Sequence, residues 1–247
     1  SALSVPLRPA DVTGAWAGLR PLLANVTARN RRASERTADL SRRHQVLVSP
    51  SGLVTVTGGK LTTYRKMAED TVGAVTEQLG REQRRSPTRR MRLRGAGRRG
   101  ARPERWGGRA EAGSTYRKSG ADLAVSDATL GHLEGRYGSE TPAVLGLAEG
   151  RPELLEPLVK GLAYLKVEAL YGVGYEMAST LEDVLARRTR ALLLDASACA
   201  EAAFGVARLI GAELGWDSRR ADEEASSFVA TVTADLACIC RDSRVEL

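Results

Sequence analysis

The clearest pattern in the chain is a change from alternating to helical spacing of apolar residues between residues 53 and 79. Val54 and Val56 alternate with threonines, as side chains of a half-buried strand do. After Gly58-Gly59 the apolar residues recur three or four positions apart, which is the spacing of one helix face. The members of this apolar stripe are Tyr64, Met67, Ala68, Val72, Val75 and Leu79. The segment therefore predicts a strand, a tight glycine turn and an amphipathic helix.

The residues around this turn extend the prediction. Residues 44–49 also have strand composition and run into Ser-Pro-Ser-Gly, so residues 44–57 are expected to form a β-hairpin. His44 opens its first strand, where a structural role is more usual for a lone histidine than proton transfer. Thr62 or Thr63 can cap the helix. Free N–H groups at a helix start favour an anion or a carbonyl oxygen, and Lys60 adds positive charge. The alternative is a strand–turn–helix corner without a ligand.

From Ser126 onward the apolar spacing is helical, and no strand signal follows residue 60. The predicted helices are 127–137 (ended by Gly138), a short one opened by Thr141-Pro142, 157–176, one opened by the capping-box-like run 180–183, 196–214, and 217–241. A hairpin and helix followed by such a run predicts an α+β chain whose C-terminal domain is all-α.

Composition narrows the class of protein. The 247 residues suffice for one large or two small domains. No run approaches the roughly 18 uncharged apolar residues of a membrane-spanning helix, and residues 1–8 lack the features of a signal peptide and resemble the interior of a domain. Three cysteines are too few for a disulfide framework. Cys238 and Cys240 have no second Cys or His pair nearby, so no metal site is expected, and all three cysteines are interpreted as small apolar helix residues.

Residues 81–118 interrupt the pattern with fourteen Arg or Lys residues against three acidic ones. The segment carries a charge of +11, whereas the whole chain carries +7, so the remainder is acidic. A disordered basic linker is one interpretation, and a patch for nucleic acid or an anionic surface is another. A third is a pair of compensating frame changes in GC-rich coding sequence. Residues 95–100 spell G-x-G-x-x-G, but no strand precedes them and no apolar helix follows, so a dinucleotide fingerprint is rejected.

Four runs, in the same order, resemble the FAD-dependent, quinone-linked (aerobic) glycerol-3-phosphate dehydrogenases. They are Trp16–Leu22, Ser41–Val46, Gly58–Glu69 with its Gly-Gly-Lys-Leu-Thr-Thr-Tyr-Arg core, and 164–168 followed by 181–190. The resemblance covers residues 11–80 and 120–235 and places the chain in the C-terminal half of that family. It implies three parts: residues 1–80 are the C-terminal edge of an FAD-binding oxidoreductase domain, 81–118 are a disordered basic linker, and 119–247 are a helical C-terminal domain.

The resemblance also implies an activity and a site. The activity is oxidation of glycerol 3-phosphate to dihydroxyacetone phosphate, with hydride passing from C2 to the flavin and electrons then to a quinone-type or other acceptor. The cofactor-binding residues would be Gly58, Gly59, Lys60, Leu61 and Thr62, and the substrate-binding residues Arg20, Arg42 and Lys60. A guanidinium suits a phosphate because its planar fork bonds two oxygens at once. Arg43 could replace its neighbour Arg42. A cytoplasmic enzyme, peripheral on the inner face of the cytoplasmic membrane and without a specific nucleic-acid partner, is expected.

Two parts of the family pattern have no counterpart in these residues. They are the nucleotide-binding βαβ unit and the usual catalytic base, so no catalytic residue is assigned. The alternative function is a non-catalytic truncated remnant, or a helical interaction module that acts through an anion-binding basic segment.

Overall fold

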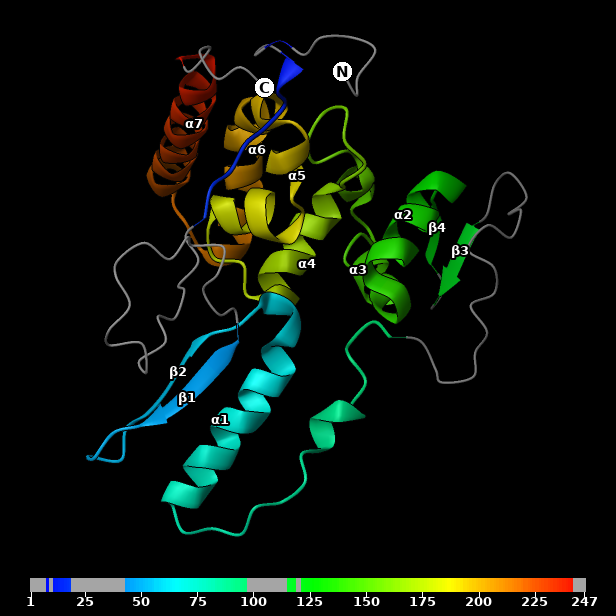
Figure 1. The fold of residues 1–247 in the computed structure, drawn as a ribbon. Coiled ribbons are helices and arrows are strands. Elements are labelled where there is room, and N and C mark those ends of the chain that lie inside the picture. Colours follow the sequence, from blue (N-terminus) through cyan, green and yellow to red (C-terminus); the bar gives the residue numbers. More distant parts are fainter. Residues whose placement is uncertain (1–7, 9–10, 19–42, 97–114, 119–120, 242–247) are drawn as a thin grey trace. The chain divides into compact units, whose positions relative to one another are not determined.

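The computed structural model describes residue 8 and residues 11–18, 43–96, 115–118 and 121–241 (Figure 1). Contacts divide the chain into two units. We call Ala17–Arg92 the hairpin unit, and Ser1–Trp16 together with Leu93–Leu247 the helical unit. Arg20 and Arg42, both predicted to bind substrate, lie outside the described residues.

The hairpin unit contains two strands and one long helix. Strand β1 (His44–Val48) pairs antiparallel with β2 (Val54–Gly58), with Val46 opposite Val56. Gly52 closes the turn between them by donating its N–H to the Ser49 carbonyl at 2.9 Å. A 3₁₀ turn, η3 (Leu61–Thr63), leads into α1 (Tyr64–Gln78), and a second, η4, covers Pro87–Arg89. The predicted hairpin, glycine turn and helix are all present.

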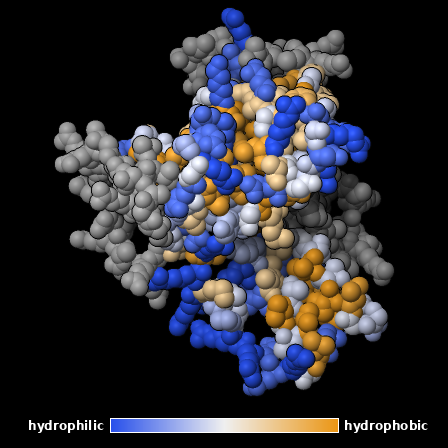
Figure 2. Space-filling view, turned by 180° about the vertical axis from the view of Figure 1, so that it is seen from behind, coloured by the Kyte–Doolittle hydropathy of each residue, from blue (hydrophilic) through white to orange (hydrophobic). Residues whose placement is uncertain are grey.

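The apolar stripe of α1 forms as predicted but is not buried. Tyr64 is 55%, Val72 62% and Leu79 62% exposed, and none of the described residues of the hairpin unit is buried. Figure 2 shows hydrophobic side chains gathered on the surface of this unit, in the lower part of the view. An amphipathic helix normally gains most of its stability by burying its apolar face. The partner of this face is therefore not among the described residues of the hairpin unit.

The helical unit follows the sequence prediction at most of its boundaries. Its helices are α2 (Asp127–Tyr137), α3 (Thr141–Gly146), α4 (Lys166–Glu176), α5 (Ala191–Leu194), α6 (Ala196–Leu214) and α7 (Ser218–Arg241), with 3₁₀ turns η5 (Gly138–Glu140) and η6 (Pro152–Leu155) and a π-helical segment η7 (Asp183–Arg188). Gly138 ends α2 at φ 55°, as expected of a terminal glycine. The Asp217 carboxylate accepts the Arg220 N–H at 2.7 Å and so caps α7.

Two apolar clusters form the core of the helical unit. The larger joins α6 and α7 with α4, α5 and η7 through residues such as Leu181, Leu185 and Ile210, all fully buried. The smaller joins α2, α3 and η6 to α4 through Leu133 and Leu145. Cys199 lies within the larger cluster, and burial raises the pKa of its thiol to about 12, as fits a structural apolar residue. Among the described residues no helix is long and apolar enough to cross a membrane.

Two sequence predictions about this part of the chain are wrong. The expected helix 157–176 forms only from Lys166, because residues 157–165 make a loop in which Gly161 takes φ 84° and Leu158 N–H bonds the Tyr164 carbonyl at 2.7 Å. Strands also occur after residue 60: β3 (Thr115–Lys118) pairs antiparallel with β4 (Ala121–Ala124). Each of these strands has only four residues, and their apolar and polar residues do not alternate clearly enough to predict a strand. Most of the G-x-G-x-x-G run lies outside the described residues.

Candidate functional site

The turn between β2 and α1 has backbone angles that favour glycine at both of its first positions. Gly58 and Gly59 take φ 74° and 85°, in the left-handed region that side chains rarely adopt. At Gly59 a Cβ would also lie 2.6 Å from Met67 Sδ and 3.2 Å from His44 Cβ, so the Met67 side chain would have to move. Met67, from the first turn of α1, therefore fills the volume that a side chain at Gly59 would need.

Lys60 is held in an extended conformation by the helix that follows it. Its φ and ψ are −126° and 148°. Thr63 Oγ1 accepts the Lys60 N–H at 3.3 Å and donates to the Lys60 carbonyl at 3.0 Å. Thr63, and not Thr62, is thus the residue that closes this turn by its side chain. Among the described residues, no acceptor is found for the N–H groups of Leu61 and Thr62.

The outer side of this turn carries uncompensated positive charge. Lys60 is exposed and forms no ion pair with any described residue. The two open amides of Leu61 and Thr62 add partial positive charge, as the N-terminal amides of a helical segment do. Lys60, Leu61 and Thr62 together can therefore hold an electron-rich group, such as a carbonyl oxygen or an anion.

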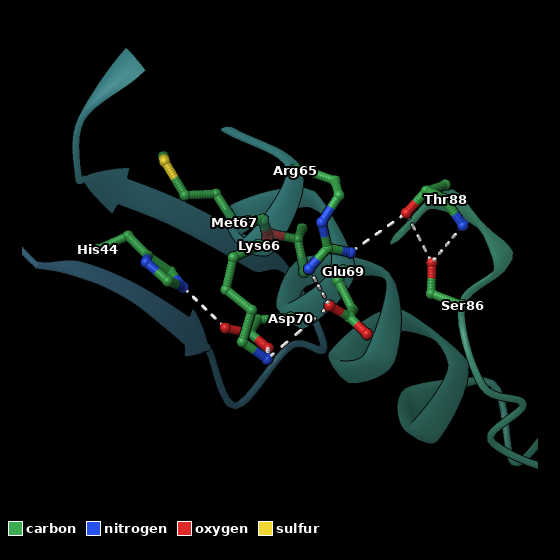
Figure 3. Close-up of polar contacts among 9 residues, drawn as sticks. His44, Arg65, Lys66, Met67, Glu69, Asp70, Ser86 and Thr88 are labelled. Carbon is green, nitrogen blue, oxygen red and sulfur yellow. Dashed lines mark hydrogen bonds and ion pairs between the residues drawn. The ribbon is translucent and has the colours of Figure 1, made fainter. Parts of the chain in front are cut away.

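A charged network behind the turn fixes α1 against β1 (Figure 3). Asp70 lies at its centre: Oδ2 is 2.9 Å from His44 Nε2 and Oδ1 accepts from Lys66 Nζ at 2.7 Å. The hydrogen bonds from Lys66 and His44 lower the pKa of the Asp70 carboxyl. The bond to Asp70 in turn raises the pKa of the Lys66 ammonium. The contact with Asp70 joins β1 to α1 through His44, and the structural role favoured for His44 stays a prediction.

A second pair continues this network along α1. Arg65 donates to Glu69 Oε2 at 2.8 Å, one helical turn away, and to Thr88 Oγ1 at 3.3 Å in η4. Arg65, a member of the family-like run, is therefore turned toward the helix surface and η4. The His44–Asp70 and Arg65–Thr88 contacts join residues 26 and 23 positions apart, so no local spacing in the sequence indicates them.

The structure brings together only part of the predicted site. Gly58, Gly59, Lys60, Leu61 and Thr62 form one continuous turn with their backbone amides and the Lys60 ammonium at its surface. The other two substrate residues lie outside the described residues, so their placement stays a prediction. Within the described residues, no group of three or more His, Cys, Asp or Glu side chains could hold a metal ion.

Among the described residues of the helical unit, the carboxylate of Glu168 is fully shielded from solvent. Its oxygens accept hydrogen bonds at 2.9 Å from Tyr137 and the Leu165 N–H, lie 2.9 Å from His132 Nε2, and form an ion pair with Arg136 at 3.2 Å. Burial and the Glu168 charge raise the pKa of Tyr137. Such a saturated carboxylate ties α2 to α4 and leaves no open site.

Arg187, Arg188 and Arg190 lie at and just after the end of η7, and we call them the basic cluster. Arg187 pairs with Glu182 at 2.7 Å and with Asp183 at 2.8 Å, so its charge is compensated within this segment.

The helical unit has the fold of a C-terminal domain from a family of oxidoreductases. Residues 86–221 match the model of the family described as the C-terminal domain of alpha-glycerophosphate oxidase, and the chain belongs to this family. The matched region begins inside the basic segment and includes all of α2 to α6. The family and the α+β fold class expected from the sequence are confirmed.

Curated relatives and a solved structure agree with this assignment. Glycerol-3-phosphate dehydrogenase 2 of Mycobacterium tuberculosis is 36% identical over 234 residues, which are 95% of this chain and 37% of that protein. The human mitochondrial glycerol-3-phosphate dehydrogenase is 33% identical over 224 residues, covering 89% of this chain and 28% of its own length. The glycerol-3-phosphate dehydrogenase of Bacillus halodurans, solved in complex with FAD, matches with a TM-score of 0.61 and 27% identity over 99% of this chain and 43% of that one. This chain therefore spans less than half the length of each.

Proposed function

We propose that this chain is the C-terminal part of an FAD-dependent glycerol-3-phosphate dehydrogenase, which oxidises glycerol 3-phosphate to dihydroxyacetone phosphate. The observation that carries the proposal is the turn Gly58–Thr62, which presents positive charge at its surface. The chain that contains this turn belongs to the family named above. The named relatives act on glycerol 3-phosphate, and the solved one binds FAD.

The residues of the turn fit the polar edge of a flavin ring. That edge is electron-rich, and the Leu61 and Thr62 amides with the Lys60 ammonium supply donors and positive charge without another partner among the described residues. Bound FAD would supply the hydride acceptor for the reaction. The contribution of this chain is to hold that ring edge and, through Gly58 and Gly59, to let it approach the backbone closely.

Lys60, Arg20 and Arg42 are proposed to bind the substrate. The phosphate of glycerol 3-phosphate needs compensating charge, which guanidinium and ammonium groups provide. Arg43 is the alternative to Arg42. The position of Lys60 in the turn supports a role at the junction of substrate and cofactor, because its ammonium has no carboxylate partner among the described residues.

The exposed stripe of α1 supports a larger protein. Tyr64, Val72 and Leu79 are more than half exposed, and a face of this kind is covered in a complete domain. We assign this exposed face of α1 to contact with a nucleotide-binding part. The relatives are long enough to contain such a part, because this chain covers only 37% and 43% of their length. A quinone-type acceptor and peripheral contact with the inner face of the cytoplasmic membrane complete the proposal and rest on the family resemblance.

Flavin content of a complete protein, in which this chain is joined to the nucleotide-binding part, tests the proposal. The purified protein should be yellow, and glycerol 3-phosphate without an acceptor should bleach its flavin absorbance. A complete, folded protein that binds FAD and is not bleached would contradict the substrate. A complete, folded and colourless protein would favour the non-catalytic alternative.

That alternative has one supporting observation. Arg81, Arg84, Arg85, Arg89 and Arg90 are exposed and form no ion pair with a described residue. Such a run is an anion-binding surface.

A further inference from the structure

Leu93–Ala96, the first residues of the helical unit after Arg92, form a tight turn within the basic segment. Ala96 donates its N–H to the Leu93 carbonyl at 3.1 Å, and Gly95 takes φ 84°. A positive φ at the third position is what a type II turn requires, and glycine is the residue that supplies it. Gly95 is also the first glycine of the G-x-G-x-x-G run that did not fit a dinucleotide site.

The backbone of this turn lies directly against the end of α2. Ser139 donates its N–H to the Gly95 carbonyl at 3.0 Å. A Cβ at Gly95 would lie 2.7 Å from the Tyr137 carbonyl, and a Cβ at Gly138 would collide with the Gly95 carbonyl. Each glycine thus allows the other's backbone to approach, and both stand at positive φ.

The side chain of Arg94 enters a clamp formed by α4 and η5. Its Nε donates to Glu140 Oε2 at 2.7 Å, and its guanidinium carbon lies 5.5 Å from the ring centroid of Tyr175. Tyr171 stacks on Tyr175 with centroids 4.9 Å apart and bonds the same Glu140 oxygen at 3.4 Å. A carboxylate beside an aromatic face is the chemistry that recognises a guanidinium.

The clamp distinguishes Arg94 from its neighbours in the basic segment. The five arginines between Arg81 and Arg90 have no ion pair with a described residue, whereas Arg94 has both a carboxylate and a ring. Because the Arg94 side chain is 61% exposed, its ion pair alone contributes little. The close backbone contact between Gly95 and Gly138 places Arg94, and no other described arginine of the basic segment, beside Glu140.

We propose that Glu140, Tyr171 and Tyr175 form an arginine-binding site occupied by the chain's own Arg94, and that Leu93–Ala96 is a strap seated there by Gly95. Arg92, the last residue of the hairpin unit, is followed directly by this strap. Because the strap is held on the helical unit, release of Arg94 would free the residues that follow Arg92 from that unit.

Trypsin tests the strap in the whole chain, because it cuts after arginine. The bond after the exposed Arg90 serves as the internal reference for the bond after Arg94. In the wild-type chain the bond after Arg94 should be cleaved at least about tenfold more slowly than the bond after Arg90, since Arg94 must first leave the clamp. Mass spectrometry of the early digest gives both rates. Glu140→Gln and Gly95→Ala should each reduce this difference several-fold.

Two matched variants separate the strap from general destabilisation. Gly161 has the same φ of 84° as Gly95, but a Cβ there meets nothing within 4 Å, so Gly161→Ala introduces the backbone strain alone. Glu149→Gln removes an exposed carboxylate of the same unit that has no described partner. Both variants should keep the wild-type ratio. Equal cleavage after Arg90 and Arg94 in the wild-type chain, or a ratio unchanged in Glu140→Gln and Gly95→Ala, would overturn the proposal.

Discussion

Thr180 and Asp183 cap each other at the start of η7. The Asp183 N–H donates to Thr180 Oγ1 at 3.0 Å, and the Thr180 N–H donates to Asp183 Oδ2 at 3.2 Å. The carboxylate also accepts the Ser179 N–H at 3.0 Å. These bonds, led by the one from Ser179, lower the pKa of Asp183 to about 2. The segment that carries Leu185 into the larger core cluster is therefore anchored by a charged aspartate.

Asp183→Asn should destabilise the helical unit by about 1 kcal/mol at pH 7, because an amide accepts the capping N–H groups less well than a carboxylate. The folded pKa of about 2 lies below the unfolded value of 3.8, so the charged form stabilises the fold above pH 4. This contribution is lost as the pH falls from about 4 to about 2. Denaturant unfolding at several pH values should show the two proteins converging below pH 3.

Asp235→Asn is the matched control. Asp235 is exposed on α7 and has no partner among the described residues. Its removal should change stability by less than about 0.5 kcal/mol. An equal loss in both variants would show that overall charge, and not the cap, is responsible.

In a complete protein, Arg20→Ala and Lys60→Ala should each lower kcat/KM for glycerol 3-phosphate by about 10²-fold or more. This corresponds to a loss of roughly 2.7 kcal/mol in transition-state stabilisation, a usual value for a charged, partly desolvated contact. Glycerol lacks the phosphate and should lose little further activity from the Arg20 change. Lys60→Ala should also shift the flavin potential, which spectroelectrochemistry measures.

Two substitutions in the helical unit control the kinetic prediction. Lys160→Ala removes an exposed lysine far along the chain from the turn, and Arg188→Ala alters the basic cluster. Both should leave kcat/KM within about threefold of wild type, with Arg188→Ala acting on stability. An inactive but stable Arg188→Ala enzyme beside an active Arg20→Ala enzyme would place the active site elsewhere.

Exchanging Arg84, Arg85, Arg89 and Arg90 for Gln should weaken binding of a DNA duplex used as a simple polyanion. Each arginine that contacts a phosphate contributes about 0.9 to the slope of log K against log salt concentration, so the slope should become shallower. The control exchanges Arg151, Arg187, Arg208 and Arg219, which already pair with carboxylates, and removes the same charge. Binding that survives the first exchange and fails in the second would refute an anion-binding role for the segment.

Limited proteolysis should cut within residues 81–118 and leave a resistant helical fragment that starts near residue 120. The reason is that both core clusters begin at Val125 or later, whereas the described residues of the basic segment are almost all exposed. Mass spectrometry of the stable fragment gives its first residue. Early loss of α6 or α7 while residues 81–118 persist would contradict this boundary.

Local chemistry explains which features could be predicted from sequence. Gly58-Gly59, Gly138 and the capping run 180–183 act within a few residues of themselves, so their turn, end and cap signals predicted the observed elements. The prediction of a helix over residues 157–176 was wrong at its start because the apolar spacing continues across Gly161, whose positive φ is incompatible with a helix. The Asp70 bond to His44 and the Met67 contact with Gly59 depend on how α1 lies against β1, which no local pattern encodes.

The lack of buried side chains in the described part of the hairpin unit has a thermodynamic consequence. The heat-capacity change on unfolding follows the apolar surface that becomes exposed, at about 12–15 cal/mol/K per residue of a folded domain. Among the described residues, fully buried apolar side chains occur in the helical unit and not in the hairpin unit, so most of this surface is released there. The core elements of the helical unit correspond to about 1.5 kcal/mol/K. In a calorimeter the hairpin unit's described residues would therefore add little to the heat-capacity step of the helical unit.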